Sequence, residues 1–134
     1  MASVLYPLGK EAFLNGDIDI DTDTIKVAAV SDNDYTYSAA HQYKSSVTSY
    51  TGSTDATVTI TSKTSGTVDA SDISAAYASL AQNSTDVIDA LVLYKDTGNA
   101  ATSPLIAYYD LAASTTPNGG DINITWNASG LFAI

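Results

Sequence analysis

Most apolar residues of this chain fall in short runs that are separated by polar, turn-forming residues, a pattern typical of β-strands. Residues 56–61 alternate strictly between apolar and polar, and residues 121–126 do the same. The second alternation places three large apolar side chains on one face, namely Ile122, Ile124 and Trp126. Residues 87–94 form the strongest apolar run and predict a central strand, and residues 24–30 predict a further strand.

Turn residues between these runs indicate how the strands are connected. Ser-Gly at residues 65–66 predicts a hairpin whose second strand ends near residue 68, and residues 74–80 predict another strand. Residues 105–110 are expected to pair with the central strand, while residues 117–120 are the clearest loop. The four apolar residues 131–134 are expected to join a sheet, because a loose apolar tail would favour aggregation.

One short helix is expected before the strands, over residues 6–15. Its apolar residues recur at intervals of three and four positions, which places them on one face: Leu5, Leu8, Ala12 and Phe13. Pro7 is tolerated in a first turn, and Gly16 is well placed to end the helix. We therefore expect an all-β protein, an antiparallel β-sandwich or barrel-like fold, with a helical arm at residues 1–16 and a single β-domain at residues 17–134.

The charge balance excludes several functions. Five lysines and no arginine stand against fifteen acidic residues, fourteen of them aspartate, so the net charge is −10. Binding to nucleic acid or to an anionic membrane surface is not expected, because both depend on clustered basic residues. The chain has no cysteine, and no apolar run approaches the roughly 20 residues of a membrane-spanning helix. No cofactor is expected.

Four alternating aspartates form the sharpest acidic cluster: Asp17, Asp19, Asp21 and Asp23. Several carboxylates can hold a cation such as calcium, so the cluster is a candidate metal site. The EF-hand pattern fails, however, because Thr22 stands where glycine is needed and Ala28 where glutamate is needed. If the stretch is extended, the aspartates share one face and Ile18 and Ile20 the other. We favour this solvated sheet edge, with a bound cation as the alternative.

Catalysis is not expected. His41 is the single histidine, and no Gly-x-Ser-x-Gly motif marks a serine nucleophile for it. The tyrosines near it are either core residues or part of a protein interface, where tyrosine is enriched. The candidate interface residues are Leu5, Tyr6, Leu8, Phe13, Tyr35, Tyr37 and Tyr43.

Several stretches resemble a known family in the same order along the chain. They are residues 10–19, 23–30, 94–98, 105–110 and 117–122, followed by Trp126 and residues 130–134. In these stretches the chain resembles small virion proteins of tailed double-stranded-DNA bacteriophages. The resemblance covers nearly the whole chain and implies a structural role in the virion without catalysis.

Within that family we expect a capsid decoration (cement) protein, made in the host cytoplasm and bound to the outside of the shell. Its expected partner is the major capsid protein or another virion protein, and its expected state is a homo-oligomer, with a trimer favoured. Residues 4–14 are a candidate docking or exchange element. The alternatives are a tail or head–tail component and, outside virion assembly, a carbohydrate-binding β-sandwich.

Overall fold

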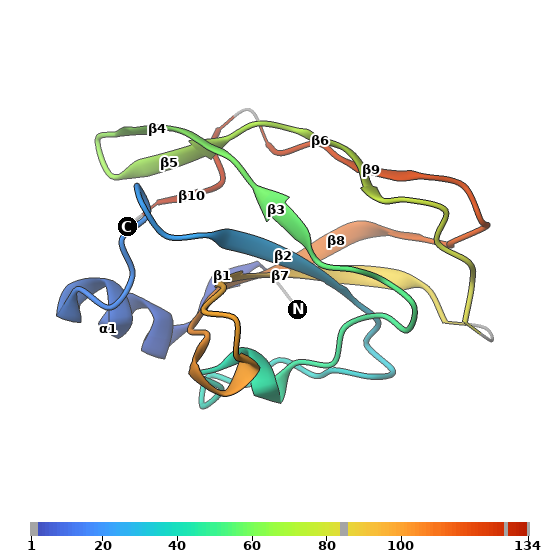
Figure 1. The fold of residues 1–134 in the computed structure, drawn as a ribbon, viewed down its shortest axis with the longest axis horizontal. Helices are drawn as coiled ribbons and strands as arrows, with labels where there is room; N and C mark the ends of the chain where they lie inside the picture. The colour runs from blue at the N-terminus through green and yellow to red at the C-terminus, as the bar shows by residue number, and fades with distance from the viewer. Residues whose placement is uncertain (1–2, 84–85, 128, 134) are drawn as a thin grey trace.

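Two layers of antiparallel β-sheet and one α-helix make up the part of the chain that the computed structural model describes, residues 3–83, 86–127 and 129–133 (Figure 1). The larger layer is a five-stranded sheet whose strands lie in the order β1 (Val4–Leu5), β8 (Leu105–Thr115), β7 (Ile88–Lys95), β2 (Ile25–Val30) and β3 (Ala56–Val58). The expected hairpin of β7 and β8 is confirmed, and β7 is central, as its apolar run predicts.

The second layer consists of two small sheets that face the first (Figure 1). One contains β10 (Phe132–Ala133), β5 (Thr67–Ala70) and β4 (Ile60–Thr64), and the other contains β6 (Ile73–Tyr77) and β9 (Ile122–Ile124). The expected hairpin across residues 65–66 joins β4 to β5. The apolar chain end at residues 131–134 joins a sheet as expected, because β10 pairs with β5. Ile134 itself lies outside the described residues. The all-β, sandwich-like prediction is confirmed.

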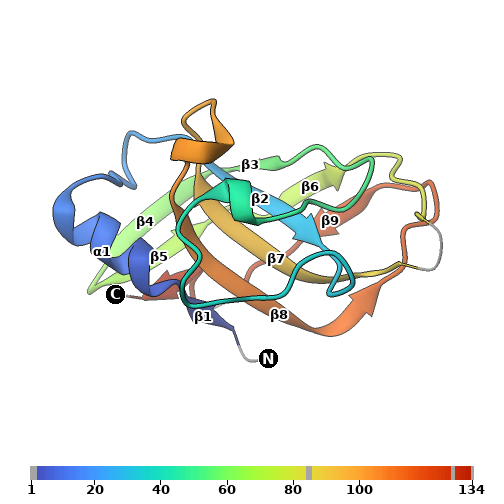
Figure 2. The same cartoon turned by 90° about the horizontal axis from the view of Figure 1, so that it is seen from below.

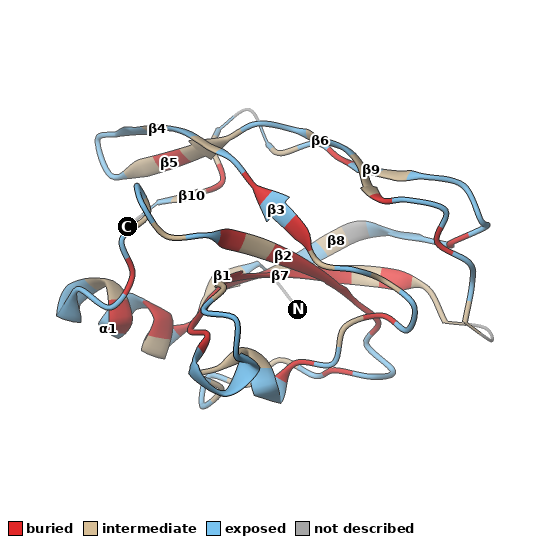
Figure 3. Cartoon of the chain, viewed as in Figure 1, coloured by how far each residue is buried: buried red, intermediate tan, exposed pale blue. Residues whose placement is uncertain are grey.

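The five-stranded sheet is buried on both faces, so the protein has two apolar cores. Along β7, Leu91 and Leu93 pack between the two layers, whereas Ala90 and Val92 pack on the opposite face. Because successive side chains of a strand point to opposite faces, the part of a strand that lies between two cores is expected to be apolar at consecutive positions, as residues 90–93 are. The buried stripe through β2 and β7 in Figure 3 marks this position.

The second core is covered by the long connection from β2 to β3, which crosses the outer face of the sheet (Figure 2). This connection contains a short 3-10 helix, η1 (Lys44–Ser46). A second 3-10 helix, η2 (Ala100–Thr102), lies in the turn from β7 to β8. Irregular chain therefore seals one face of the sheet, while the second β-layer seals the other.

The predicted helix is confirmed as α1 (Pro7–Asn15), with Gly16 ending it in the left-handed conformation at φ +80°. The backbone of Gly9 lies directly against β8, where a side chain would collide with the carbonyl oxygen of Leu105. The amide of Tyr6 donates to the carbonyl of Ile106 at 2.9 Å, and β1 pairs with β8. The described part of the helical arm, residues 3–16, is thus tied to the β-domain along β8.

The alternating segment at residues 56–61 is not one strand. It changes layers at Thr59, so that β3 belongs to the five-stranded sheet and β4 to the small one. The strand expected at residues 74–80 is shorter and begins earlier, as β6. Its register with β9 is irregular, and Ala75 has a positive φ of 51°.

Candidate functional site

The alternating aspartates at residues 17–23 do not form the extended edge that their spacing predicts. The carbonyl of Asp19 accepts hydrogen bonds from the amides of Thr22 and Asp23, which is the pattern of a turn. Asp23 Oδ2 accepts from the amide of Asp19 at 2.7 Å, and Asp19 Oδ1 accepts from the amide of Asp21 at 3.0 Å. The prediction of an edge is therefore wrong, because these carboxylates fold the backbone around themselves.

The turn also does not direct its carboxylates toward a common position where a cation could bind. Asp23 lies 3.1 Å from Lys95 and Asp21 pairs with Lys63, while Asp17 offers its carbonyl to Lys95 at 2.7 Å. Burial raises the pKa of Asp23, but the Asp19 amide and Lys95 outweigh it and leave the pKa below its ordinary value. Within the described residues no group of three acidic or histidine side chains is placed to hold a metal ion.

Two of the candidate interface residues are core residues instead. Tyr6 is 0% exposed and Tyr35 is 4% exposed, both in the core beneath the long connection. The interface prediction is wrong for these two tyrosines, because their rings are already covered by this chain. The other candidates are half-buried: Leu5, Leu8, Phe13, Tyr37 and Tyr43.

A chain of hydrogen bonds links the buried tyrosines to His41. The hydroxyls of Tyr6 and Tyr35 lie 2.7 Å apart, and the Tyr35 hydroxyl lies 2.8 Å from His41 Nδ1. Burial and the bond to Tyr35 raise the pKa of Tyr6. The described structure thus pairs the imidazole with a phenol, and a serine nucleophile is not among its hydrogen-bond partners.

Next to this network lies an open pocket of about 340 Å³. Its lining combines acidic and aromatic side chains: Asp32, Tyr35, Thr36, Tyr37, Asp89, Tyr108 and Asp110. Asp32 follows the end of β2, Asp89 lies in β7 and Tyr108 in β8, so three neighbouring strands deliver these groups to one place. Three carboxylates and three tyrosines therefore line one pocket, which makes it the candidate binding site.

Two carboxylates lie side by side in this pocket. Asp89 Oδ1 accepts a hydrogen bond from the backbone amide of Asp32 at 2.8 Å. Burial, followed by the neighbouring carboxylate of Asp32, raises the pKa of Asp89 above its ordinary value. Sequence reasoning missed this pair. The available signal was Asp89 itself, an acidic residue inside the strongest apolar run.

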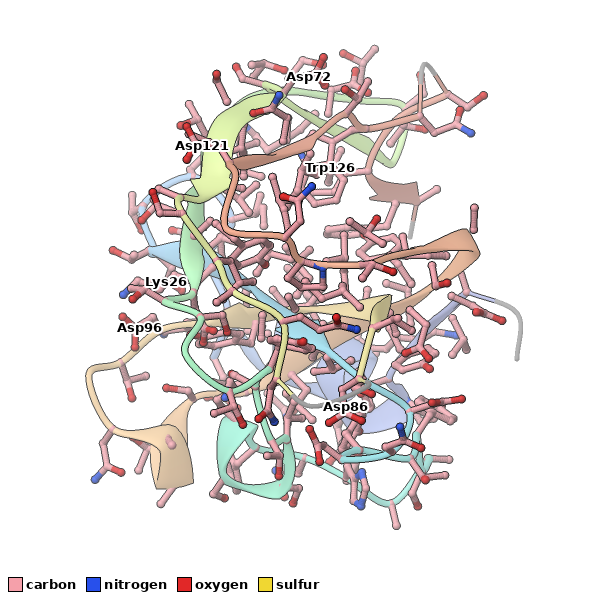
Figure 4. The ribbon with its side chains drawn as sticks, turned by 90° about the vertical axis from the view of Figure 1, so that its right-hand side faces the viewer. Lys26, Asp72, Asp86, Asp96, Asp121 and Trp126 are labelled. Carbon is pink, nitrogen blue, oxygen red and sulfur yellow. The ribbon has the colours of Figure 1, made fainter. Side chains whose placement is uncertain are left out.

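A larger pocket of about 460 Å³ lies between the layers, beside Tyr109 and Trp126. Both of these aromatic residues use their polar atoms within the fold. The hydroxyl of Tyr109 donates to the carbonyl of Leu131 at 2.9 Å, and the indole of Trp126 donates to the carbonyl of Ser71 at 3.0 Å. Figure 4 shows Trp126 and Asp72 together in the upper layer, where the Asp72 carboxylate accepts the Trp126 amide. The Tyr109 contact joins the two layers, whereas both Trp126 contacts lie within the second layer.

Comparison with protein families, with curated proteins and with solved structures found no match. Within the described residues, no helix has the length and apolar character needed to cross a membrane.

Proposed function

We propose that this chain is a non-enzymatic structural protein of a tailed-phage virion, and that it binds the outside of the coat-protein shell as a decoration (cement) protein. The observation that carries the proposal is the resemblance to small phage virion proteins, whose order is kept along nearly the whole chain. The resembling stretches include most of α1, all of β2 and the first half of β8. Because the resembling stretches lie in the helix and the main strands, the resemblance extends over the whole fold and is not confined to one loop.

The distribution of charge supports contact with protein in preference to DNA. Four of the five lysines lie in ion pairs with aspartates of this chain: Lys26–Asp96, Lys44–Asp55, Lys63–Asp21 and Lys95–Asp23. Figure 4 shows the first pair, Lys26 and Asp96, whose charged atoms lie 2.9 Å apart. Because the net charge is −10 and most lysines are already neutralised, the surface favours a partner that carries basic groups. A position outside the shell keeps this charge away from the packaged genome.

The proposal includes a homotrimer, since an icosahedral shell offers local threefold positions to a protein of that symmetry. Mass photometry of the purified chain tests this part by itself. A species of three times the monomer mass is expected, and a strict monomer at every concentration contradicts it.

Binding to capsids tests the main proposal. The purified chain is mixed with empty shells assembled from the coat protein of the same phage, and the mixture is sedimented and imaged by cryo-electron microscopy. Added density is expected at symmetric positions on the outer surface. Shells that sediment without the chain would refute the decoration role. Density found only on tails of the parent particle would instead assign it to the tail.

A further inference from the structure

We propose that the pocket formed by Asp32, Asp89 and Tyr108 is a docking site for an arginine side chain of a partner protein. This inference concerns the pocket alone and does not require the partner to be a capsid protein. Four properties of the site carry it: a pair of carboxylates, an open hydroxyl, aromatic walls and the lack of any arginine in this chain.

The first property is an acidic pair for which the described part of the chain supplies no counter-charge. Asp89 is half-buried and lies against Asp32, and among the described residues neither carboxylate has an ion pair. Two neighbouring carboxylates repel each other, and partial burial adds a cost to the charge of Asp89. A cation bound between them offsets both penalties, and a guanidinium can donate parallel hydrogen bonds to a carboxylate.

The second property is the hydroxyl of Tyr108. The residue is only 7% exposed, yet no described residue forms a hydrogen bond with its hydroxyl. In the described structure every polar side-chain atom that is fully sealed from solvent has a hydrogen-bond partner. The Tyr108 hydroxyl therefore keeps an open surface, and the pocket that this residue lines supplies it. A phenol in this position can accept a hydrogen bond from a cation.

The third property is the aromatic wall. The ring of Tyr37 lies 5.5 Å from that of Tyr108 at 52°, and the ring of Tyr35 lies 6.3 Å from Tyr108 at 48°. Cations are attracted to the faces of such rings, and the flat guanidinium group also stacks on them. A volume of about 340 Å³ leaves room for a planar group and the aliphatic stem behind it.

The fourth property identifies the source of the cation as another protein. This chain has no arginine, so no second copy can supply a guanidinium. Among its lysines, Lys10 is the one that the described structure leaves outside an ion pair, on the exposed side of α1. A small divalent ion fits less well, because the described residues hold no group of three acidic or histidine side chains at metal-binding spacing.

The test is a titration of the isotope-labelled chain with N-acetyl-arginine amide, followed by two-dimensional NMR. Saturable shifts are expected at residues 32, 37, 89 and 108. Replacing Asp89 by Asn keeps its shape and its acceptor oxygen but removes the charge, and is expected to weaken binding about tenfold or more. Asp32→Asn is expected to act in the same direction. Tyr108→Phe keeps the ring and is expected to weaken binding several-fold, which separates the hydroxyl from the acidic pair.

Asp17→Asn is the matched control. It removes the same charge beside Lys95, which pairs with Ile25 at the end of β2 opposite the pocket, about 20 Å away for a six-residue strand. This variant is expected to leave binding unchanged. Equal weakening by Asp17→Asn and Asp89→Asn would mean attraction to net charge and would overturn the site. N-acetyl-lysine amide binding as tightly as the arginine probe would overturn the guanidinium assignment. A calcium salt or methyl glycosides shifting these residues without any response to arginine would also overturn it. None of these results depends on capsid binding.

Discussion

Replacing Tyr35 by phenylalanine is expected to destabilise the fold more than replacing Tyr6, although the two hydroxyls share a single hydrogen bond. The asymmetry comes from what each substitution leaves behind. Without the Tyr6 hydroxyl, Tyr35 keeps its bond to His41 at 2.8 Å. Without the Tyr35 hydroxyl, Tyr6 holds a polar atom in a residue that is 0% exposed, and no other described residue bonds to it.

The magnitudes follow from these partners. Tyr6→Phe removes one hydrogen bond, whose net contribution is about 1 kcal/mol. Tyr35→Phe removes two and leaves the buried Tyr6 hydroxyl unsatisfied, so its cost is about 2–3 kcal/mol. His41 is half-buried and can bond to water instead. In the double variant no buried hydroxyl is left unsatisfied, so its cost is expected to be no greater than that of Tyr35→Phe alone.

Urea unfolding measures these free energies, with Trp126 fluorescence and far-ultraviolet circular dichroism as probes. Trp126 is the single tryptophan and packs against Tyr109 in the other core, so neither substitution touches it. The four proteins form a double-mutant cycle, and equal denaturant slopes justify comparing them. Equal single costs, or a double variant whose cost is the sum of both, would show that the Tyr6 hydroxyl finds another partner.

Three further predictions concern stability and its dependence on pH. Gly9→Ala is expected to cost about 1–3 kcal/mol by thermal or urea unfolding, because the new methyl group collides with the Leu105 carbonyl and lifts α1 from β8. Gly130→Ala, at φ +107° and with atoms of β5 too close for a Cβ, is expected to cost about 2 kcal/mol or more in the same assay. Asp89→Asn is expected to stabilise the fold at neutral pH. Its pKa is raised in the folded state, so its ionised form opposes folding there, and the gain is expected to shrink as the pH falls through that pKa.

Each of these has a control in the chain. Glu11→Ala, at an exposed position of α1, is expected to leave stability within about 0.5 kcal/mol, so an equal loss there would contradict the collision at Gly9. Gly98→Ala carries the left-handed strain without a collision, because no atom lies within 4 Å of its Cβ position. A cost matching that of Gly130→Ala would assign both to backbone strain. Asp17→Asn removes the same charge at a position away from Asp32 and is the control for Asp89→Asn.

The sequence predicts the helix and the main strands because their apolar spacing is set by burial. Residues 87–94 and 105–110 belong to a sheet that is covered on both faces, so their apolar residues follow one another without interruption for several positions. Loops at the surface do not show such runs. The break at Thr59 is invisible to the same reasoning, because the alternation continues while the chain passes from one sheet to the other. Residues 17–23 mislead in another way. An alternation of aspartate and isoleucine suits a strand edge, and aspartate equally suits a turn that bonds to its own amides.

The pocket was beyond single-sequence reasoning for a topological reason. Asp32 and Asp89 stand far apart in the sequence and meet only because β2 and β7 pair antiparallel, with Val30 opposite Ala90. Tyr108 joins them because β8 lies on the other side of β7. Only the interruption of an apolar run by Asp89 pointed toward the site.

The burial of β7 on both faces has a consequence for how its alignment is chosen during folding. A strand that is polar on one face cannot slip by one residue without exposing apolar groups and burying polar ones, whereas β7 is apolar on both and lacks this safeguard. Asp89 provides the missing safeguard against such a slip. A shift by one position would move its carboxylate away from the Asp32 amide and toward the core between the layers. The acidic residue that makes the pocket negative therefore also helps to fix the register of β7 against β2.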